Sequence, residues 1–293
     1  MRVQLIDFDS KIPNLALMKI SSYHKSLGHT VGFDIPDPDK VYISTIFKKN
    51  KSSVIGLATM FPKAEVDIGG VGWDIYKSLP ENIELIKPDY DLYPSTYSQG
   101  YTTRGCIRKC EFCVVPTKEG KIKTAQHPRL FHDDRFDTCM IMDNNLLAAQ
   151  NWWIKYVIEW FRDNNIRMLS PQGWDARLLS EDTAGLLKDV KHAAGLHFAW
   201  DNIKDEEKIL NSITLLKDAG FSKNDLRKIS YYVLVGFNST FEEDLYRCIK
   251  LKQNGVCAFV MKYHNKDKRL NDLARWANRR QLFWSMPFEN YKP

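Results

Sequence analysis

The sequence has no apolar run that approaches the roughly 20 residues a membrane-spanning helix needs. Its first residues, Met1-Arg2-Val3-Gln4-Leu5-Ile6-Asp7, lack the longer apolar core and small-residue cleavage site of a secretory signal. It also has no low-complexity tract and no visible internal repeat, which excludes disordered and solenoid classes. These absences predict a cytoplasmic protein with no membrane partner.

Charge of one sign is only mildly in excess. The 293 residues carry a formal net charge of +6, which permits acidic partners, nucleic acid included, but does not decide the function. The hydrophobic fraction of 44% is that of an ordinary globular protein with one large domain or two modest ones. The six cysteines are expected to stay reduced in a reducing compartment, so disulfide bonds do not explain their spacing.

The first third of the chain alternates between strand-like and helix-like stretches. Short apolar runs predict strands, and apolar residues at helical spacing predict helices between them. The predicted strands are 3–7, 30–35, 41–46 and 66–68, and the predicted helices are 14–27 and 51–60. Gly69-Gly70-Val71-Gly72 lacks dinucleotide-motif spacing and predicts a plain turn. The alternation predicts a small parallel sheet, ending in a linker-like segment over residues 88–100.

The remainder alternates in the same way. The predicted strands are 99–103, 138–142, 167–171, 196–200, 229–235 and 258–262, and the predicted helices are 151–164, 180–191, 205–219 and 240–253. Ser180 and Thr240 occupy helix-entry positions. Six strand–helix units predict an open or partial barrel, in which chemistry gathers at the C-terminal ends of the strands.

Three cysteines follow the first of these strands within eight residues: Cys106, Cys110 and Cys113. This spacing lets one loop wrap a single metal centre, and three protein ligands leave one metal position open, as catalytic sites require. A structural zinc site is the alternative, but it needs a fourth ligand, and His127 and His132 lie at spacings of no common finger. Chance burial of the three thiols is a second alternative.

The run Cys106-x-x-x-Cys110-x-Phe112-Cys113 resembles the signature of the radical S-adenosylmethionine (radical SAM) superfamily. The resemblance implies a 4Fe–4S cluster on the three cysteines, and S-adenosylmethionine bound at the open iron. It also implies reductive cleavage of that cofactor and hydrogen abstraction from a substrate. The implied fold is α/β, with a small Rossmann-like N-terminal domain (1–95), a partial (β/α)6 radical SAM barrel (96–265) and a helical, aromatic C-terminal tail (266–293) packing on the barrel.

The same resemblance implies which strand ends contact S-adenosylmethionine. Polar residues after the second strand would face the methionine amine, and Arg177, after the third strand, would meet the carboxylate. Residues ending the fourth and fifth strands would lie near the adenosine. The implied cofactor-binding residues are Phe112, Asp143, Asn144, Asn145, Gln172, Asp175, Arg177, Asp201, Val235, Gly236 and Asn238. Turns, helix caps and a surface arginine are the alternative explanations for these residues.

Two regions outside the barrel have their own expectations. The N-terminal domain resembles the cobalamin-binding module of some relatives but lacks the Asp-x-His-x-x-Gly loop, so we expect no cobalamin through that motif. Aromatic and basic residues of the tail could stack on nucleic acid, although packing over the barrel end is the favoured interpretation.

Cys139, Cys248 and Cys257 have no close thiol partner in the sequence and are expected to be buried as small apolar residues.

A radical SAM enzyme needs an electron donor, and the resemblance implies a flavodoxin or ferredoxin-type partner. Basic residues around the cysteine loop would steer an acidic donor, with Arg108 and Lys109 near the docking face. Arg104-Gly105-Cys106 is also similar to the cysteine loop of methylthiotransferases, but no second cysteine trio is present. The substrate is not identified by the sequence. The rival class is a non-catalytic iron–sulfur or zinc protein that carries electrons or binds nucleic acid.

Overall fold

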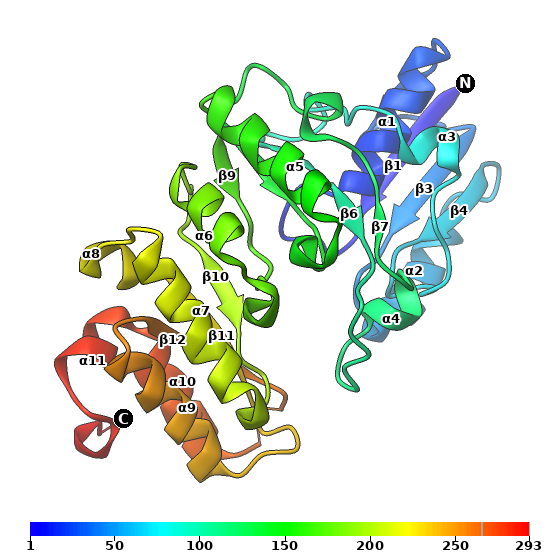
Figure 1. Cartoon of the computed structure of the whole chain (residues 1–293). Coiled ribbons are helices and arrows are strands. Elements are labelled where there is room, and N and C mark those ends of the chain that lie inside the picture. The colour runs from blue at the N-terminus through cyan, green and yellow to red at the C-terminus, as the bar shows by residue number, and fades with distance from the viewer. Residues whose placement is uncertain (265, 293) are drawn as a thin grey trace.

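The computed structural model describes residues 1–264 and 266–292 as an α/β protein built on parallel sheets (Figure 1). The boundary predicted at residue 265 and the end of the predicted tail at residue 293 lie outside the described residues. Among the described residues, no helix combines the length and the apolar character needed to cross a bilayer.

The N-terminal region is a four-stranded parallel sheet in the order β2-β1-β3-β4. Its strands are β1 (Arg2–Asp7), β2 (Thr30–Gly32), β3 (Lys40–Ser44) and β4 (Glu65–Gly69), and its helices are α1 (Leu15–Ser26), η1 (Lys48–Asn50), α2 (Lys51–Ala58) and α3 (Glu81–Glu84). Leu17 and Ile20 of α1 pack on Val3 and Leu5 of β1, while Val54 of α2 packs on β3. The predicted small parallel sheet is confirmed.

The rest of the chain contains two parallel sheets of three strands. One has the order β5-β8-β9 (Ser98–Gly100, Thr138–Ile141, Arg167–Leu169), and the other β10-β11-β12 (His197–Ala199, Ser230–Val235, Cys257–Lys262). A parallel bridge between Trp174 and Phe198 connects the segment after β9 to β10. Within each sheet the strands lie in chain order, with their C-terminal ends at one edge.

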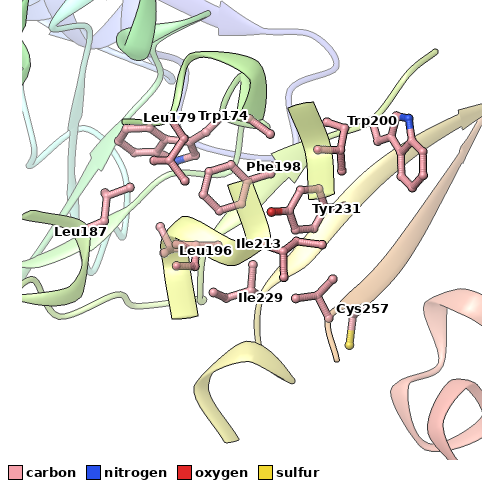
Figure 2. Close-up of a cluster of buried hydrophobic side chains, with 14 of the residues drawn as sticks. Trp174, Leu179, Leu187, Leu196, Phe198, Trp200, Ile213, Ile229, Tyr231 and Cys257 are labelled. Atoms are coloured by element: carbon pink, nitrogen blue, oxygen red, sulfur yellow. The ribbon is translucent and has the colours of Figure 1, made fainter. Parts of the chain in front are cut away.

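Helices cross over between these strands, and their apolar faces form one core with the sheets. The longer helices are α5 (Asn151–Asp163), α6 (Glu181–Lys188), α7 (Glu206–Asp218), α9 (Phe241–Gln253), α10 (Lys268–Asn278) and α11 (Arg280–Ser285). Figure 2 shows Phe198 and Tyr231 at the centre of this core, with Ile213 of α7 beside them. Ser180 and Thr240 cap α6 and α9 as predicted, Thr240 in a capping box with Glu243.

The short elements are α4 (Val115–Lys118), α8 (Lys223–Leu226) and the antiparallel pair β6 (Thr103–Arg104) and β7 (Lys123–Thr124). The strand predicted across 99–103 was wrong in its extent, because the parallel ladder ends at Gly100 and Thr103 pairs instead with Thr124. The helix predicted over 180–191 ends at Lys188, since the following segment turns to bridge Met168 through His192. Cys139, Cys248 and Cys257 are buried, as predicted.

The tail residues Trp276 and Phe283 are fully buried in the same core. Their indole and phenyl rings are in contact, with centroids 5.0 Å apart. This burial leaves neither ring with a free face for stacking on nucleic acid.

A buried ion pair on α9 ties the ends of β10 and β11 together. Arg247 is 0% exposed and donates to the Trp200 carbonyl at 2.6 Å and the Leu234 carbonyl at 2.7 Å. It also donates to Asp244 Oδ1 at 2.5 Å, while Asp244 Oδ2 accepts from the Gly236 N–H at 3.0 Å. A charge buried this deeply depends on its partner for solvation.

We therefore predict that Asp244→Ala destabilises the fold by about 3–5 kcal/mol, because it leaves the Arg247 guanidinium buried without its counter-ion. Adding Arg247→Met should recover part of this loss, since the uncompensated charge is then removed. The matched control is Glu242→Ala, which breaks the exposed pair with Arg269 and should cost less than about 1 kcal/mol. Urea denaturation followed by tryptophan fluorescence measures all three. Equal effects of Asp244→Ala and Glu242→Ala would contradict the prediction.

Candidate functional site

The cysteine loop begins directly after β6, which follows β5 at the edge where the C-terminal ends of its parallel sheet lie. Gly105 precedes the first cysteine with a φ of +81°, and a Cβ there would lie 2.3 Å from the Lys121 carbonyl oxygen. Only glycine fits this turn without strain. Cys106, Cys110 and Cys113 are partly exposed and are free cysteines.

Nitrogen donors surround two of the three sulfur atoms. The Arg108 N–H lies 3.3 Å from Cys106 Sγ, and the Val115 N–H lies 3.5 Å from Cys113 Sγ. The Asn145 side-chain amide donates to Cys106 Sγ at 3.3 Å from the loop after β8. Hydrogen bonds of this kind stabilise sulfur that carries negative charge, as a metal-bound thiolate does.

Among the described residues, no group of three or more His, Cys, Asp or Glu side chains converges closely enough to hold one metal ion. The two histidines considered as zinc ligands contact aromatic residues of α5 instead. His127 lies over Tyr156 with ring centroids 4.0 Å apart, and His132 packs on Trp160 at 5.2 Å.

Asp143, after β8, is the junction between that strand and the cysteine loop. Its carboxylate accepts hydrogen bonds from the Thr102 N–H at 2.6 Å, from the Thr102 hydroxyl, and from the Thr103 hydroxyl at 2.7 Å. Burial outweighs these donors and raises the pKa of Asp143 to about 6. The prediction from sequence gave Asp143 to the cofactor, but all the contacts found for it hold the cysteine loop.

The next two residues face the cysteine loop more directly. Asn144 Oδ1 accepts from the Gly105 N–H at 3.0 Å, which fixes the turn before Cys106. Asn145 is 6% exposed, and its Oδ1 has no hydrogen-bond partner among the described residues. A small cavity at the ends of β8 and β9 is lined by Asn144, Asn145, Gln172 and Trp174, together with Asp143. The fold thus brings together predicted residues from two different loops.

Asp175 joins three loops of the site. It accepts from Arg177 Nε at 2.6 Å and from Arg108 Nε at 2.8 Å, and the Asn145 amide lies 3.4 Å away. Burial acts to raise the pKa of Asp175, but the two guanidinium groups prevail and hold it below its usual range. Arg177 also contacts Asp205 at 2.9 Å. Arg108 therefore pairs with Asp175, and its place near a docking face stays a prediction.

Asp201, after β10, is a half-buried carboxylate at this edge. Burial raises its pKa to about 6, although the charges of Arg247 and Arg177 act in the opposite direction. Burial also raises the pKa of the Cys110 thiol, and the Asp201 carboxylate adds to this shift. The Asp201 carboxylate and the Cys110 thiol therefore interact electrostatically at the ends of the strands.

Residues after β11 contact the cysteine loop from the opposite side. The Phe112 ring packs edge-on against Phe237 with centroids 5.4 Å apart, and Asn238 donates to Glu111 at 3.3 Å. Val235 is fully buried, so only its backbone could reach a ligand. Gly236 borders a cavity of about 340 Å³ between the N-terminal ends of α9 and α10.

Aromatic rings line the face of β11 and β12 that the helices do not cover. In β12, Ala258 and Val260 are buried while Phe259 and Met261 are 41% and 48% exposed, the alternation of a strand with one open face. Tyr232 of β11 stacks on His197 and contacts Phe259. The strands therefore present a ring-rich surface on their open face.

Sequence reasoning missed several residues that organise the site: Thr102, Thr103, Arg108 as a partner of Asp175, and Phe237. Thr102 and Thr103 adjoin the cysteine motif, so the place was visible, but their partner lies some 40 residues away in the chain. No family model matches the chain, and no curated protein matches it either.

The raised pKa of Asp143 predicts a pH dependence of stability. Because the folded state holds this proton more tightly than an unfolded chain does, the stabilisation is present below about pH 4 and is lost as the pH rises through about 6. Asp143→Asn abolishes the loss. Relative to the wild type, the variant should gain on the order of 2 kcal/mol between pH 4.5 and 7, measured by urea denaturation.

The matched control is Asp225→Asn. Hydrogen bonds from Lys188 and Ser222 lower the pKa of Asp225 to about 2, so its contribution is lost only as the pH falls toward that value. The effect of this variant should stay constant between pH 4.5 and 7. A stability difference between Asp143→Asn and the wild type that does not change with pH would show that Asp143 titrates normally.

Proposed function

We propose that the chain is a radical SAM enzyme, with a 4Fe–4S cluster on Cys106, Cys110 and Cys113 and S-adenosylmethionine at its open iron. In this proposal β5, β8, β9, β10, β11 and β12 form a partial (β/α)6 barrel, and the N-terminal sheet is a Rossmann-like domain. The strand order, the parallel bridge between Trp174 and Phe198 and the crossover helices support this assignment.

One observation carries the proposal. Three partly exposed cysteines lie on one loop after the first barrel strand, and polar residues that follow β8, β9 and β11 contact that loop. Parallel α/β sheets place chemistry at this edge. Chance burial of three cysteines would not explain the nitrogen donors directed at Cys106 and Cys113.

The residues present fit a cluster better than a single ion. Each cysteine of a cubane binds a different iron, so the three sulfur atoms need not meet at one point. The N–H groups of Arg108 and Val115 and the Asn145 amide are suited to stabilise cluster-bound thiolates. A fourth protein ligand is not needed, and the open position is available to a cofactor.

The loops after β8 and β9 fit the methionine end of S-adenosylmethionine. Asn145 Oδ1 is a buried acceptor without a partner among the described residues, and it suits an ammonium group. Arg177 uses Nε for Asp175 and Nη1 for Asp205, so we propose Nη2 as the donor to the carboxylate. Gln172 and Asp201 would border the same space, and Gly236, Val235 and Asn238 would lie on the adenosine side.

The chemistry that these groups supply, when bound, is reductive cleavage of a sulfonium followed by hydrogen abstraction from a substrate. The chain itself holds the cysteine loop through Asp143, orients the cofactor through Asn145 and Arg177, and offers the aromatic face of β11 and β12 to the substrate. An acidic flavodoxin or ferredoxin would approach Lys109, an exposed lysine of the cysteine loop.

In this proposal the N-terminal domain resembles a cobalamin module by fold but acts without cobalamin. The crevice at the ends of β1 and β3 is where such sheets bind ligands. Here the Asp9 carboxylate reaches across it to the Thr45 hydroxyl at 2.8 Å, the Ile46 N–H at 2.7 Å and Asn50 at 2.8 Å. The chain's own carboxylate therefore holds the loop that would otherwise receive an anionic ligand.

Replacing Cys106, Cys110 and Cys113 together with alanine should abolish both the cluster absorbance of anaerobically reconstituted protein and its cleavage of S-adenosylmethionine. The reason is that cluster anchoring and cofactor binding depend on the same three thiolates. The products to measure are 5′-deoxyadenosine and methionine after chemical reduction. Cys257→Ala, which removes a buried thiol remote from the loop in sequence, is the control and should retain both properties. Tetrahedral zinc in anaerobically prepared protein, or a cluster without cofactor cleavage, would refute the proposal.

Asn145→Ala should lower the reduction potential of the reconstituted cluster, because the variant removes a hydrogen bond that offsets negative charge at Cys106 Sγ. It should also weaken S-adenosylmethionine binding through loss of the Oδ1 acceptor. Redox titration followed by electron paramagnetic resonance measures the first effect, and calorimetry the second. Asn144→Ala is the matched control, because its amide contacts the Gly105 N–H and no sulfur. Identical potentials for the two variants would argue against the assigned role of Asn145.

A further inference from the structure

A surface of lysines and aromatic rings lies at the C-terminal edge of the N-terminal sheet, outside the site described above. We call it the lysine–aromatic surface, and it consists of Phe47, Lys48, Lys49, Lys51, Trp73 and Tyr76. Phe47 is 46% exposed and Tyr76 is 75% exposed. The three lysines are exposed as well.

Backbone contacts between two loops hold these residues on one surface. The Gly72 N–H donates to the Thr45 carbonyl at 3.0 Å, and a Cβ at Gly72 would lie 2.6 Å from the Phe47 backbone nitrogen. The turn after β4 therefore packs against the loop after β3. Lys49 lies over the Phe47 ring at 5.6 Å, and Lys51 lies over the Trp73 ring at 5.5 Å. Cations and rings are interleaved across both loops.

Helix stability does not explain this distribution of charge. Lys48, Lys49 and Lys51 occupy η1 and the start of α2, where the helix dipole is positive, and no acidic residue is present in either first turn. The Asp9 carboxylate beside this loop is turned inward and accepts hydrogen bonds from Thr45, Ile46, Phe47 and Asn50. The positive charge is therefore concentrated where it destabilises the helix, and it is available to an anionic partner.

We propose that the lysine–aromatic surface binds single-stranded nucleic acid. Lysines that neutralise phosphates, together with exposed rings on which unpaired bases stack, are the combination such binding uses. An acidic protein would need the charge but not the exposed Phe47 and Tyr76 rings. The surface also adjoins the cysteine loop, because Lys118 of α4, five residues after Cys113, donates to the Lys77 carbonyl at 2.6 Å.

A strand bound at this place would lie beside the segment that follows the cysteine loop. The idea that the bound strand is the substrate rests on the proposed function. Binding of a strand to the lysine–aromatic surface does not depend on that function. The test therefore uses the full chain without cluster or cofactor, so that failure of cofactor cleavage and failure of nucleic-acid binding are separate results.

The experiment is fluorescence anisotropy with labelled RNA and DNA single strands of about 15 nucleotides, over a series of salt concentrations. Lys48→Glu/Lys49→Glu/Lys51→Glu should weaken binding about tenfold or more and reduce the slope of log K against log salt by about 2. Phe47→Ala/Tyr76→Ala should weaken binding about fivefold or more and leave that slope unchanged, since stacking releases no counter-ions. Circular dichroism checks that both variants remain folded.

The matched control is Lys208→Glu/Lys217→Glu/Lys223→Glu, which makes the same change of charge at exposed positions of α7 and α8. It should bind with the wild-type salt dependence. Equal binding by the two lysine variants would overturn the proposal. The proposal would also be overturned by a pair of results: polyglutamate displaces the strand, and the Phe47→Ala/Tyr76→Ala variant binds the strand as tightly as the wild type. Together these results would identify a docking face for an acidic protein. Duplex bound as tightly as the single strand would also overturn it.

Discussion

The position of the cysteine loop depends on the buried carboxylate of Asp143. Three donors from Thr102 and Thr103 converge on it, which anchors the segment that leads to Cys106 to the end of β8. A buried carboxylate surrounded by donors is costly to displace, because each donor would lose its partner in a place that water does not reach. Asn144 extends the same constraint to the Gly105 turn. The three thiols are therefore held by a polar junction within the fold, before any metal ligation contributes.

A second polar network connects that loop to the N-terminal domain. Arg104, two residues before Cys106, contacts Glu84 of α3 and lies 3.1 Å from Glu119, and its guanidinium stacks on the Tyr101 ring at 4.0 Å. Glu84 also pairs with Lys19 of α1 at 3.0 Å, and burial lowers the pKa of this lysine. Because this network is partly buried, salt screens it less than it screens a surface pair. The N-terminal domain thus helps to fix the cysteine loop.

The sequence predicted the elements whose periodicity is local and missed the contacts that join distant segments. Strand β11 and helix α9 fall within one residue of their predicted bounds, because an apolar run and a capping box define each one locally. The split after Gly100 could not be predicted, since it depends on the pairing of Thr103 with Thr124. The cysteine trio and the strand-end residues were visible as motifs. Whether Arg177 stays free or pairs with Asp205 depends on a residue 28 positions away, and no local pattern encodes that contact.

The electrostatic balance at Cys110 depends on Arg177. Burial and the nearby Asp201 carboxylate raise the pKa of the Cys110 thiol, whereas the charge of Arg177 acts to lower it. Asp175 pairs with both Arg108 and Arg177, and Arg177 also pairs with Asp205, so each guanidinium has a carboxylate partner. The proposed cluster would replace thiols with thiolates and release protons, so the loop would then carry several negative charges. Arg177 is the arginine whose charge acts on Cys110, and there it would favour the thiolate form.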